Sequence, residues 1–474
     1  MLNIDGFESI EKVVRFFEEF SSIPHGSGNT SHIADYLVDF AKKRGLEYSR
    51  DNADNVIIRK KATAGYEHRP AIILQGHLDM VAEKKPGAAI DMEKEGLTLY
   101  RDGDFLRAKD TTLGGDDGVA LAYALAVLDS EDIPHPDFEA VFTSDEEIGL
   151  LGAVAIDPSE IKGRLLINID SDEEGVFTVG CAGGMRSDIT LPVCREESEA
   201  DSYRVKVSGF KGGHSGVEID KGRVNANKAL TEILSGLGEI CIKDIRGGNA
   251  DNAIPRECEC VFTYEGDPSE LVRRLGDEMS EKYKDIEPNI TVSVEKAECA
   301  LAPLTLKDSL KLVSLLDKLP SGIIAMSNDI PGLVETSLNL GILRLEDEKA
   351  EISFSVRSAK GAEKAALGER LESIARVHGA SYSTRGEYPA WEYKKDSHLR
   401  DVMKKVYEDM YNKSPEIVII HAGLECGIFS EKIEGLDCVS IGPNNYDIHT
   451  TEERLSLSSL KRVWEFLVEV LKEI

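Results

Sequence analysis

The sequence has 474 residues, 41% of them hydrophobic and 30% charged, a composition that fits a folded globular protein and excludes a disordered or membrane-embedded one. A chain of this length exceeds one ordinary hydrophobic core, so we expect two domains. The 86 acidic residues outnumber the 56 basic ones, and the formal net charge of -30 repels polyanions and argues against a nucleic acid partner.

Membrane segments and a disulfide framework are not predicted by any part of the sequence. The longest apolar run, Val119 to Leu128, is about half the length that a membrane helix needs. The N-terminal stretch from Met1 to Glu8 lacks the basic, apolar pattern of a signal peptide. The eight cysteines are scattered along a long chain, which is typical of reduced thiols. We therefore expect a cytoplasmic protein with no membrane partner.

The first part of the chain alternates helical and strand patterns in the way that builds an α/β layer. Helix periodicity covers 8–21 and 30–44, and a further helix is expected at 117–128. Short apolar runs predict buried strands at 55–59, 71–75, 139–143 and 165–169. We predict from this order a mainly parallel sheet flanked by helices.

From about residue 191 the pattern changes to amphipathic strands and charged helices. Two successive groups of these elements predict an α+β domain, with strands at 203–207, 258–264, 290–294, 334–345, 352–356 and 381–387 and helices after 223 and at 269–283, 307–319 and 362–377. The α/β pattern resumes after 389, with elements at 399–411, 417–420, 439–441 and 456–471. An interrupting segment is most simply an inserted domain. We therefore predict one discontinuous α/β domain, 1–186 and 388–474, and an inserted domain at 187–387.

The first candidate site residues stand where an apolar strand ends. The run from Ile72 to Gly76 leads into His77, and Asp79 follows two residues later. In extended chain this spacing places both side chains on one face, where the Asp can hold the second imidazole nitrogen of a metal-binding His. A His at the carboxyl end of a parallel strand is well placed to bind a ligand. A hydrogen bond between two surface residues is the alternative.

Paired acidic residues open two of the expected helical segments. Asp116 and Asp117 stand among three glycines, which let backbone approach an ion closely. Glu146 and Glu147 follow the next strand. Helix capping explains one acid at each place, and Ser144 with Glu147 forms a legitimate capping box. Adjacent carboxylates can instead divide the work, one binding a metal while the other moves protons.

Two further polar residues belong to the same α/β domain. Asp170 closes the strand at 165–169, and His449 lies in a loop near the C-terminus. A turn Asp and an exposed loop His explain each of them singly. Five such residues, however, lie at or just after expected strands of one domain, and separate explanations for each do not account well for that coincidence. The ends of strands are where sheets of this kind bind ligands. With Glu146, these five residues predict a two-metal hydrolytic site that has its own general base.

Several motifs occur in an order that resembles the dizinc aminoacyl-histidine dipeptidases, also called Xaa-His or cytosolic nonspecific dipeptidases. These belong to a larger group of metallopeptidases with the aminoacylases and zinc carboxypeptidases. The resemblance covers essentially the whole chain, through the motifs at 55–60, 75–80, 114–118, 144–153, 246–257, 421–427 and 449–452. It implies a zinc-peptidase-like α/β catalytic domain and makes the inserted α+β domain a lid or dimerisation domain.

The resemblance implies a ligand role for each of the five residues. Asp116 would bridge two Zn²⁺ ions per subunit, for which Co²⁺ or Mn²⁺ could substitute. His77 and Asp170 would complete the ligands of one ion, and Glu147 and His449 those of the other.

The same resemblance assigns the general base and its surroundings. Glu146 would be the base, and Asp79 would orient His77. The peptide bond between Asp116 and Asp117 is expected to be cis, as it usually is in relatives.

Four other residues are implied to bind the substrate. His214, in a Gly-rich turn, matches a residue that stabilises the tetrahedral oxyanion in relatives, often in the active site of the other subunit. Asn252 and Arg357 match residues that bind the free carboxylate, a task that suits the planar fork of Arg. Gly423 matches a backbone contact to the substrate, while the rest of the motif at 421–427 has no assigned role. A homodimer is implied as well.

We therefore expect a metallo-dipeptidase that hydrolyses unblocked dipeptides, Xaa-His dipeptides among them. A related tripeptide aminopeptidase, carboxypeptidase or amino-acid deacylase would use the same metals, and a non-catalytic peptide-binding protein would use the same scaffold. Glu146 argues against the last, because binding alone needs no base. The sequence departs from the relatives at three positions, because they commonly carry Pro, Asn and Asn where Ala82, Lys85 and Asp117 stand. None of these departures removes a candidate ligand or the base.

Overall fold

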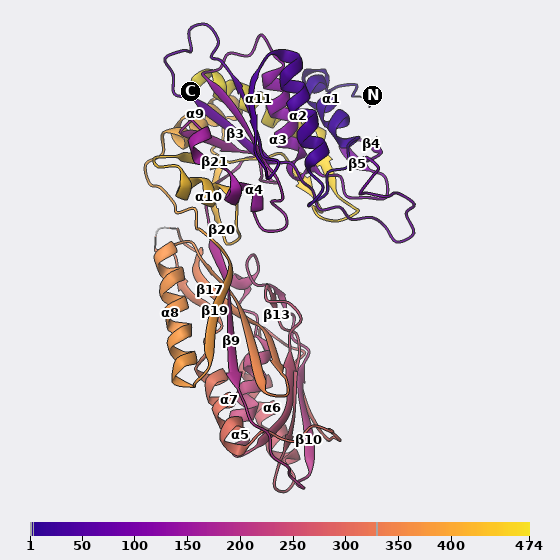
Figure 1. Cartoon of the computed structure of the whole chain (residues 1–474), viewed down its shortest axis with the longest axis vertical. Coiled ribbons are helices and arrows are strands. Elements are labelled where there is room, and N and C mark those ends of the chain that lie inside the picture. Colours follow the sequence, from indigo (N-terminus) through magenta and orange to yellow (C-terminus); the bar gives the residue numbers. More distant parts are fainter. Residues whose placement is uncertain (1, 3, 329) are drawn as a thin grey trace. The chain divides into compact units, whose positions relative to one another are not determined.

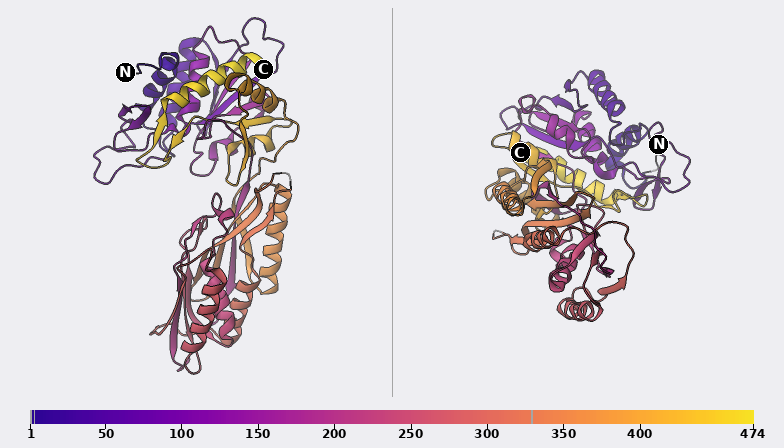
Figure 2. Two further views of the ribbon diagram at one scale, coloured as in Figure 1. Left: turned by 180° about the vertical axis from the view of Figure 1, so that it is seen from behind. Right: turned by 60° about the horizontal axis from the view of Figure 1, so that its bottom comes forward.

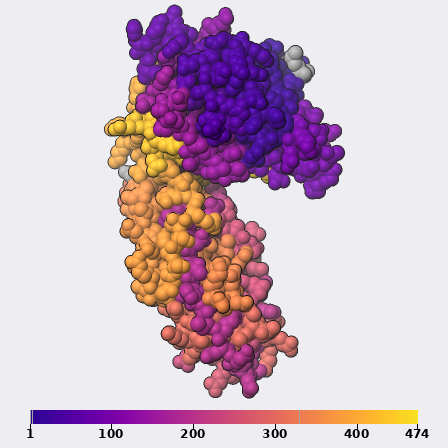
Figure 3. Space-filling view, viewed as in Figure 1, coloured from indigo at the N-terminus to yellow at the C-terminus, as the bar shows by residue number. Residues whose placement is uncertain are grey.

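The computed structural model describes residues 2, 4–328 and 330–474, so that Met1 and Asn3 of the N-terminal stretch lie outside the described part. The chain packs as two compact units (Figure 1). The first comprises Met1–Cys181, Tyr393–Ile419 and Leu424–Ile474, and the second comprises Ala182–Glu392 and Ile420–Gly423. In the first unit the C-terminal residues, yellow in Figure 3, lie beside N-terminal residues, which are indigo to magenta. This unit is therefore built from segments that are far apart in the sequence.

Eight strands of the described residues form the main sheet of the first unit. Their order is β1 (Glu47–Arg50), β2 (Val56–Lys60), β6 (Phe138–Thr143), β3 (Ile72–His77), β7 (Leu165–Asn168), β21 (Asp437–Ser440), β8 (Val176–Cys181) and β20 (Glu416–Ile420). The central four, from β6 to β21, run parallel, whereas β1, β2 and β8 pair antiparallel. Every residue of β3, β6 and β7 is buried, as expected of parallel strands covered on both faces. The predicted α/β fold is confirmed, with its parallel strands in the middle of a mixed sheet.

Helices cover this sheet and supply most of its apolar core. They are α1 (Glu11–Ser21), α2 (Ser31–Arg44), α3 (Gly115–Leu128), α9 (His398–Tyr411) and α11 (Leu457–Glu473). Two shorter helices, α4 (Leu151–Ala155) and α10 (Glu425–Lys432), belong to the same unit. The C-terminal helix α11, yellow in Figure 2, lies across the front of the sheet in the left view. α3 packs against both α1 and β3, which is why all residues from Gly118 to Leu128 are buried. Within the described residues, no helix combines the length and the apolar character needed to cross a membrane.

A smaller sheet in the same unit carries a loop from the C-terminal segment. Its order is β22 (Asn445–Tyr446), β23 (Arg454–Ser456), β5 (Phe105–Ala108) and β4 (Leu99–Asp102). β22 and β23 pair antiparallel, with Asn445 opposite Leu455. Residues 447–453 are therefore a hairpin loop, and His449 lies within it.

The second unit contains an antiparallel sheet that counts nine strands in its described residues. Their order is β15 (Thr291–Lys296), β10 (Ser202–Ser208), β14 (Cys258–Thr263), β12 (Cys241–Gly247), β17 (Val334–Leu345), β18 (Lys349–Ser358), β9 (Gly183–Pro192) and β19 (Ser381–Tyr388), with β16 (Gly322–Met326) beside β17. The helices that share its apolar core are α5 (Ala226–Leu237), α6 (Ser269–Tyr283), α7 (Leu306–Lys318) and α8 (Gly361–Val377). Buried and partly exposed side chains alternate along β10, so one face of the sheet is covered. The α+β character expected of the inserted segment is confirmed.

The predicted domain limits, 1–186, 187–387 and 388–474, fall a few residues from the limits of the compact units and stay a prediction. One short segment differs, since Ile420–Gly423 belongs to the second unit although its sequence neighbours belong to the first. Ala182 N donates a hydrogen bond to Ile420 O at 3.0 Å, within the second unit. This contact joins residues too far apart in sequence for a local pattern to reveal.

Candidate active site

All six residues of the predicted two-metal site lie in the first unit, at one edge of its sheet. His77 is the last residue of β3, Asp170 follows the end of β7, and the pair 146–147 follows β6. Asp116 lies in the first turn of α3, and His449 in the hairpin loop. Carboxyl ends of parallel strands meet at the same edge, which is why side chains far apart in sequence converge there.

Among the described residues, two groups of three candidate ligands share the carboxylate of Asp116. His77, Asp116 and Asp170 form one group, and Asp116, Glu147 and His449 form the other; within each group the donor atoms lie within 4.8 Å of one another. His77 Nε2 lies 2.9 Å from Asp116 Oδ1, and His449 Nε2 lies 3.3 Å from Asp116 Oδ2. The two oxygens of one carboxylate thus face different imidazoles. This arrangement can hold two cations with Asp116 between them.

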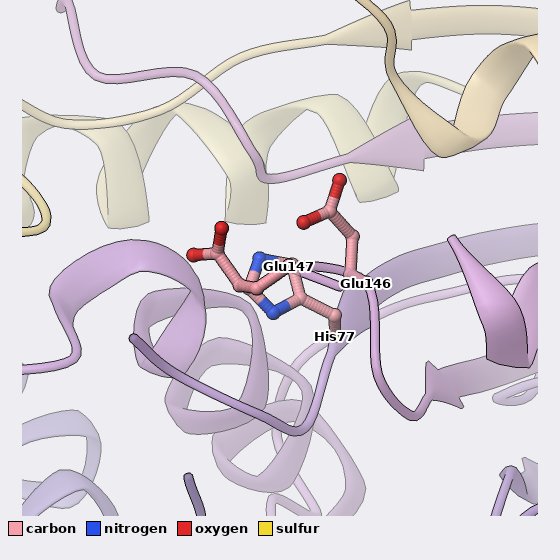
Figure 4. Close-up of side chains that lie close together, drawn as sticks. All are labelled: His77, Glu146 and Glu147. Atoms are coloured by element: carbon pink, nitrogen blue, oxygen red, sulfur yellow. The ribbon is translucent and has the colours of Figure 1, made fainter. Parts of the chain in front are cut away.

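The neighbouring carboxylates of Glu146 and Glu147 point in different directions around the His77 ring (Figure 4). Glu147 Oε1 lies 2.8 Å from His449 Nε2. Glu146 forms a third candidate group with His77 and Glu147, but it belongs to neither of the groups that contain Asp116. Its carboxylate therefore stands beside the two cation positions and is free to do another task.

The carboxylate of Asp79 accepts hydrogen bonds from the backbone of Glu146 and Glu147 and so fixes their position. Its Oδ1 accepts a hydrogen bond from Glu146 N at 2.9 Å, and its Oδ2 accepts from Glu147 N at 3.3 Å and from Ser27 Oγ at 2.7 Å. The H-x-D spacing predicts that this carboxylate holds His77 Nδ1. In the structure the main-chain oxygen of Asp79 is closer to that nitrogen, at 2.9 Å against 3.6 Å for the carboxylate. Asp79 thus contacts His77 chiefly through its backbone and the Glu pair through its side chain.

β3 and α3, which carry the candidate ligands His77 and Asp116, pack closely against each other. A Cβ on Gly76 would lie 2.2 Å from Ala120 Cβ, so only glycine lets α3 approach β3 here. Asp117 is 1% exposed and accepts hydrogen bonds from His77 N and Ala120 N, both at 3.3 Å. Asp117 is therefore a buried cap of α3. The peptide bond between Asp116 and Asp117 is cis, as the resemblance implies.

The crowding of acidic groups shifts several pKa values. Burial raises the pKa of Asp170 well above its usual value, and the charge of Asp116 adds to this shift. Burial also raises the pKa of Glu146 to about 8. Hydrogen bonds with Asp116 and Glu147 raise the pKa of His449 to about 10. These directions reflect excess negative charge in a buried place, and bound dications would relieve it by favouring ionised carboxylates and neutral imidazoles.

In the second unit, His214 lies next to Asn252, because Ser215 N donates a hydrogen bond to Asn252 O at 2.8 Å. The backbone N–H groups of Gly216 and Val217 both donate to His214 Nδ1, at 3.2 Å. A ring nitrogen that accepts hydrogen bonds carries no proton, so the neutral ring carries its proton on Nε2. Burial, and then the charge of a nearby arginine, lowers the pKa of His214. His214 therefore offers a neutral N–H donor.

Arg357 and Gly423 meet at a residue that no sequence motif marks, Tyr388. Arg357 Nη1 donates a hydrogen bond to Tyr388 Oη at 2.9 Å, and a Cβ on Gly423 would lie 2.7 Å from the Tyr388 ring. His421 Nε2 lies 2.7 Å from Ser337 Oγ, and Ser337 is paired with Arg357 across β17 and β18. Burial, helped by the charge of Arg357, lowers the pKa of His421 to about 4. The predicted carboxylate-binding Arg357 thus has a neutral imidazole as a neighbour.

Comparison with known proteins decides the family. The family model described as peptidase family M20/M25/M40 matches residues 73–473. The chain belongs to this family. It is 37% identical over 467 residues to the cytosol non-specific dipeptidase of Escherichia coli (strain K12), with 97% of this chain and 96% of that protein covered. The crystal structure of aminoacylhistidine dipeptidase from Vibrio alginolyticus is similar with a TM-score of 0.92 and 33% identity, covering 98% of this chain and 96% of that one.

The resemblance seen in the sequence motifs is confirmed by these matches. As a member of peptidase family M20/M25/M40, the chain is a hydrolase acting on peptide bonds, which is the enzyme class predicted from the sequence. The crystal structure of aminopeptidase PepT from Bacillus cereus, with a TM-score of 0.58, 17% identity and 98% of both chains covered, shares the fold alone.

A buried carboxyl lies beneath the candidate site of this M20/M25/M40 peptidase. Glu425 is 0% exposed, and its Oε2 accepts hydrogen bonds from Gln75 Nε2 and Thr143 Oγ1, both at 2.6 Å. Gln75 lies in β3 two residues before His77, and Thr143 ends β6. Burial raises the pKa of Glu425 to about 7. Glu425 thus links β3 and β6, the strands that carry or precede candidate site residues. In the sequence, only its place in the motif at 421–427 indicated a role for it.

Proposed function

We propose that this peptidase is a dinuclear zinc dipeptidase that hydrolyses unblocked dipeptides, Xaa-His dipeptides among them, with metal-activated water. The observation that carries the proposal is the carboxylate of Asp116, which is common to two candidate ligand groups that leave Glu146 unused beside them. The names of two relatives support the substrate class, because one is a cytosol non-specific dipeptidase and the other an aminoacylhistidine dipeptidase.

The donor atoms suit two zinc ions. Catalytic zinc takes imidazole nitrogen and carboxylate oxygen, usually from three protein residues, and keeps one position open. Each group offers one imidazole and two carboxylates, counting Asp116 in both. The carboxylates would offset the repulsion between two dications. Co²⁺ and Mn²⁺ accept similar donors and are the expected substitutes.

Glu146 is the general base in this proposal. When bound, a pair of zinc ions lowers the pKa of a shared water toward ~7 and polarises the scissile carbonyl. The Glu146 carboxylate accepts the proton of this water and passes it to the leaving amine. Asp79 keeps the base in position, because its carboxylate holds the backbone N–H of Glu146 at 2.9 Å.

Residues of the second unit bind the dipeptide in this proposal. His214 donates its Nε2–H to the developing oxyanion, a role supported by a ring whose Nδ1 already accepts two hydrogen bonds. Arg357 and Asn252 bind the free carboxylate, the former through its planar fork of N–H donors. Gly423 offers a backbone contact, which the absence of a side chain permits.

A substrate panel tests the proposed activity. The chelated protein, reloaded with zinc, cobalt or manganese, is expected to release amino acids from unblocked dipeptides, with Xaa-His and β-alanyl dipeptides included in the panel. Blocked dipeptides, tripeptides and N-acyl amino acids are expected to remain intact, and the chelated protein is expected to be inactive until metal is restored. Preferential cleavage of tripeptides or N-acyl amino acids would instead favour an aminopeptidase or a deacylase. Absence of dipeptide hydrolysis in every metal form would contradict the proposal.

We further propose a cytoplasmic homodimer in which His214 completes the active site of the other subunit. The compartment is supported by the name of the Escherichia coli relative. Mixing His214→Ala with Glu146→Gln, each nearly inactive alone, is expected to restore about a quarter of the sites, since half of random two-fold dimers are hybrids with one complete site. Peptidase activity after subunit exchange is the measurement. Hybrids no more active than the separate variants would show that His214 acts within its own chain.

A further inference from the structure

A buried carboxylate, Glu453, joins two loops that carry candidate metal ligands. It is 3% exposed. Its Oε2 accepts hydrogen bonds from the backbone N–H groups of Leu113, at 2.7 Å, and Gly114, at 3.0 Å. Its Oε1 accepts from Gly115 N at 2.9 Å and from Asn445 Nδ2 at 3.2 Å. One side chain thus receives four hydrogen bonds from described residues of two distant segments.

These contacts fit the ionised form of Glu453. Each of its oxygens accepts two hydrogen bonds, and all four partner atoms are donors, so a protonated carboxyl would have no acceptor for its own proton among them. Burial raises the pKa of Glu453, against the opposing effect of these hydrogen bonds. Gly115, whose N–H donates to Glu453, comes just before Asp116 and Asp117, whose backbone angles are not helical.

The loop at 113–115 that Glu453 holds leads directly into Asp116. A Cβ on Gly115 would lie 2.7 Å from Asn445 Nδ2, so this loop packs tightly against the side chain that also contacts Glu453. The loop therefore has little freedom to shift. The position of the backbone just before Asp116 thus depends on the hydrogen bonds between this loop and Glu453.

The same carboxylate closes the hairpin loop that carries His449. Within the loop at 447–453, Thr450 N donates to Asp447 O and Glu453 N donates to Thr450 O, both at 3.2 Å. His449 has a φ of 61°, a left-handed conformation that a non-glycine residue keeps only where its surroundings impose it. The loop is ordered internally, and Glu453 fixes its base to the segment that precedes the bridging carboxylate.

We propose that Glu453 is a positioning residue for the cation position formed by Asp116, Glu147 and His449. The inference rests on the proposed dinuclear function and deepens it, by naming what sets the spacing between Asp116 and His449. Their facing atoms, Asp116 Oδ2 and His449 Nε2, are 3.3 Å apart. Without the anchor the two loops can move independently, and a divalent cation at this position loses affinity.

Glu453→Gln tests this role in the full-length protein. The amide keeps the size of the side chain but turns an NH₂ group toward N–H donors, so that hydrogen bonds are lost. Apoprotein is titrated with Co²⁺ and followed by calorimetry and by the visible absorption of the ion. The unmodified protein is expected to bind two ions, and the variant is expected to bind one of them about tenfold or more weakly.

Glu139→Gln is the matched control. Glu139 is also 3% exposed and accepts hydrogen bonds from the N–H groups of Lys162, at 2.9 Å, and Gly163, at 2.7 Å. It lies in β6 near the end of the strand opposite to the candidate site. Its substitution is expected to lower thermal stability, as Glu453→Gln does, but to leave the affinity for both Co²⁺ ions unchanged.

Equal Co²⁺ affinities in Glu453→Gln and the unmodified protein would overturn the positioning role and leave the dinuclear proposal standing. Binding of fewer than two ions by the unmodified protein would contradict the dinuclear proposal, and the inference with it. If Glu453→Gln does not fold, Asn445→Ala decides the question by removing one of the four donors. Weaker binding of one ion by that variant supports the role of Glu453, and unchanged binding contradicts it.

Discussion

Replacing Glu146 with Gln is expected to lower kcat by about 10²- to 10⁴-fold while both metal ions stay bound. The amide has nearly the shape of the carboxylate but cannot accept a proton, so water deprotonation loses its base. Glu146 belongs to neither ligand group that contains Asp116, which is why metal content should not change. Steady-state kinetics on a cleaved dipeptide, together with metal analysis of the purified variant, measures both expectations.

The neighbouring substitution Asp145→Asn is the matched control for this loop. Asp145 accepts a hydrogen bond from Gly28 N at 2.7 Å, and asparagine retains an oxygen for that contact. We expect this variant to keep both metal ions and a kcat near that of the unmodified protein. Full activity in Glu146→Gln would remove Glu146 from the mechanism. Loss of a metal ion from Glu146→Gln would instead make it a ligand.

The convergence of the candidate ligands could be predicted because most of them end strands that are easy to find. His77 ends β3, and Glu147 and Asp170 follow β6 and β7; the apolar runs of all three strands stand out in the sequence. Parallel strands present their carboxyl ends at one edge, so residues placed there must be neighbours whatever the details of packing. Their roles as ligands remain predictions, which the metal-binding experiments test.

Hydrogen-bond partners could not be predicted in the same way, because they depend on how segments approach one another. The spacing of His77 and Asp79 predicts a contact between their side chains, and the Asp79 carboxylate does lie 3.6 Å from His77 Nδ1. The hydrogen bond that the same carboxylate accepts from Glu146 N could not be predicted from that spacing. Glu453 lies 338 positions from Gly115, whose N–H it accepts, and no local pattern links the two. Glu453 belongs to none of the groups of candidate ligands that the described residues form, so ligand chemistry gave no reason to select it from the sequence.

One edge strand of the main sheet, β1, could not be predicted from sequence patterns. β1 (Glu47–Arg50) is polar and partly exposed, so it lacks the apolar run that marks a buried strand. Its position depends on pairing with β2, from Glu47 opposite Arg59 to Arg50 opposite Val56. A strand held chiefly by its neighbour shows weak preference in its own residues. The parallel strands β3, β6 and β7 at the centre of the sheet, which position the site, are instead fully buried and mostly apolar, so their own residues predict them.

Replacing Asp116 with Ala is expected to abolish the binding of both metal ions. Two candidate ligand groups contain both an aspartate and a histidine, and among the described residues only Asp116 belongs to both of them. Loss of the metal pair removes Lewis-acid stabilisation worth several kcal/mol, and each 1.36 kcal/mol is a factor of ten, so kcat/KM should fall at least about 10³-fold. Calorimetric titration of the apoprotein with Zn²⁺ and assay of the dipeptide panel measure the two effects.

The number of metal ions bound per subunit distinguishes Asp116→Ala from substitutions that affect only one of the two ligand groups. His77→Ala and His449→Ala each remove a ligand from one of the Asp116-centred groups, so each is expected to lose one ion and keep the other. Asp117→Asn is the adjacent control, because Asp117 is in neither group and asparagine can still accept a hydrogen bond from the backbone. It should bind two ions. If Asp116→Ala retained one ion at full affinity, the carboxylate would not join the two positions, and each imidazole would define an independent site.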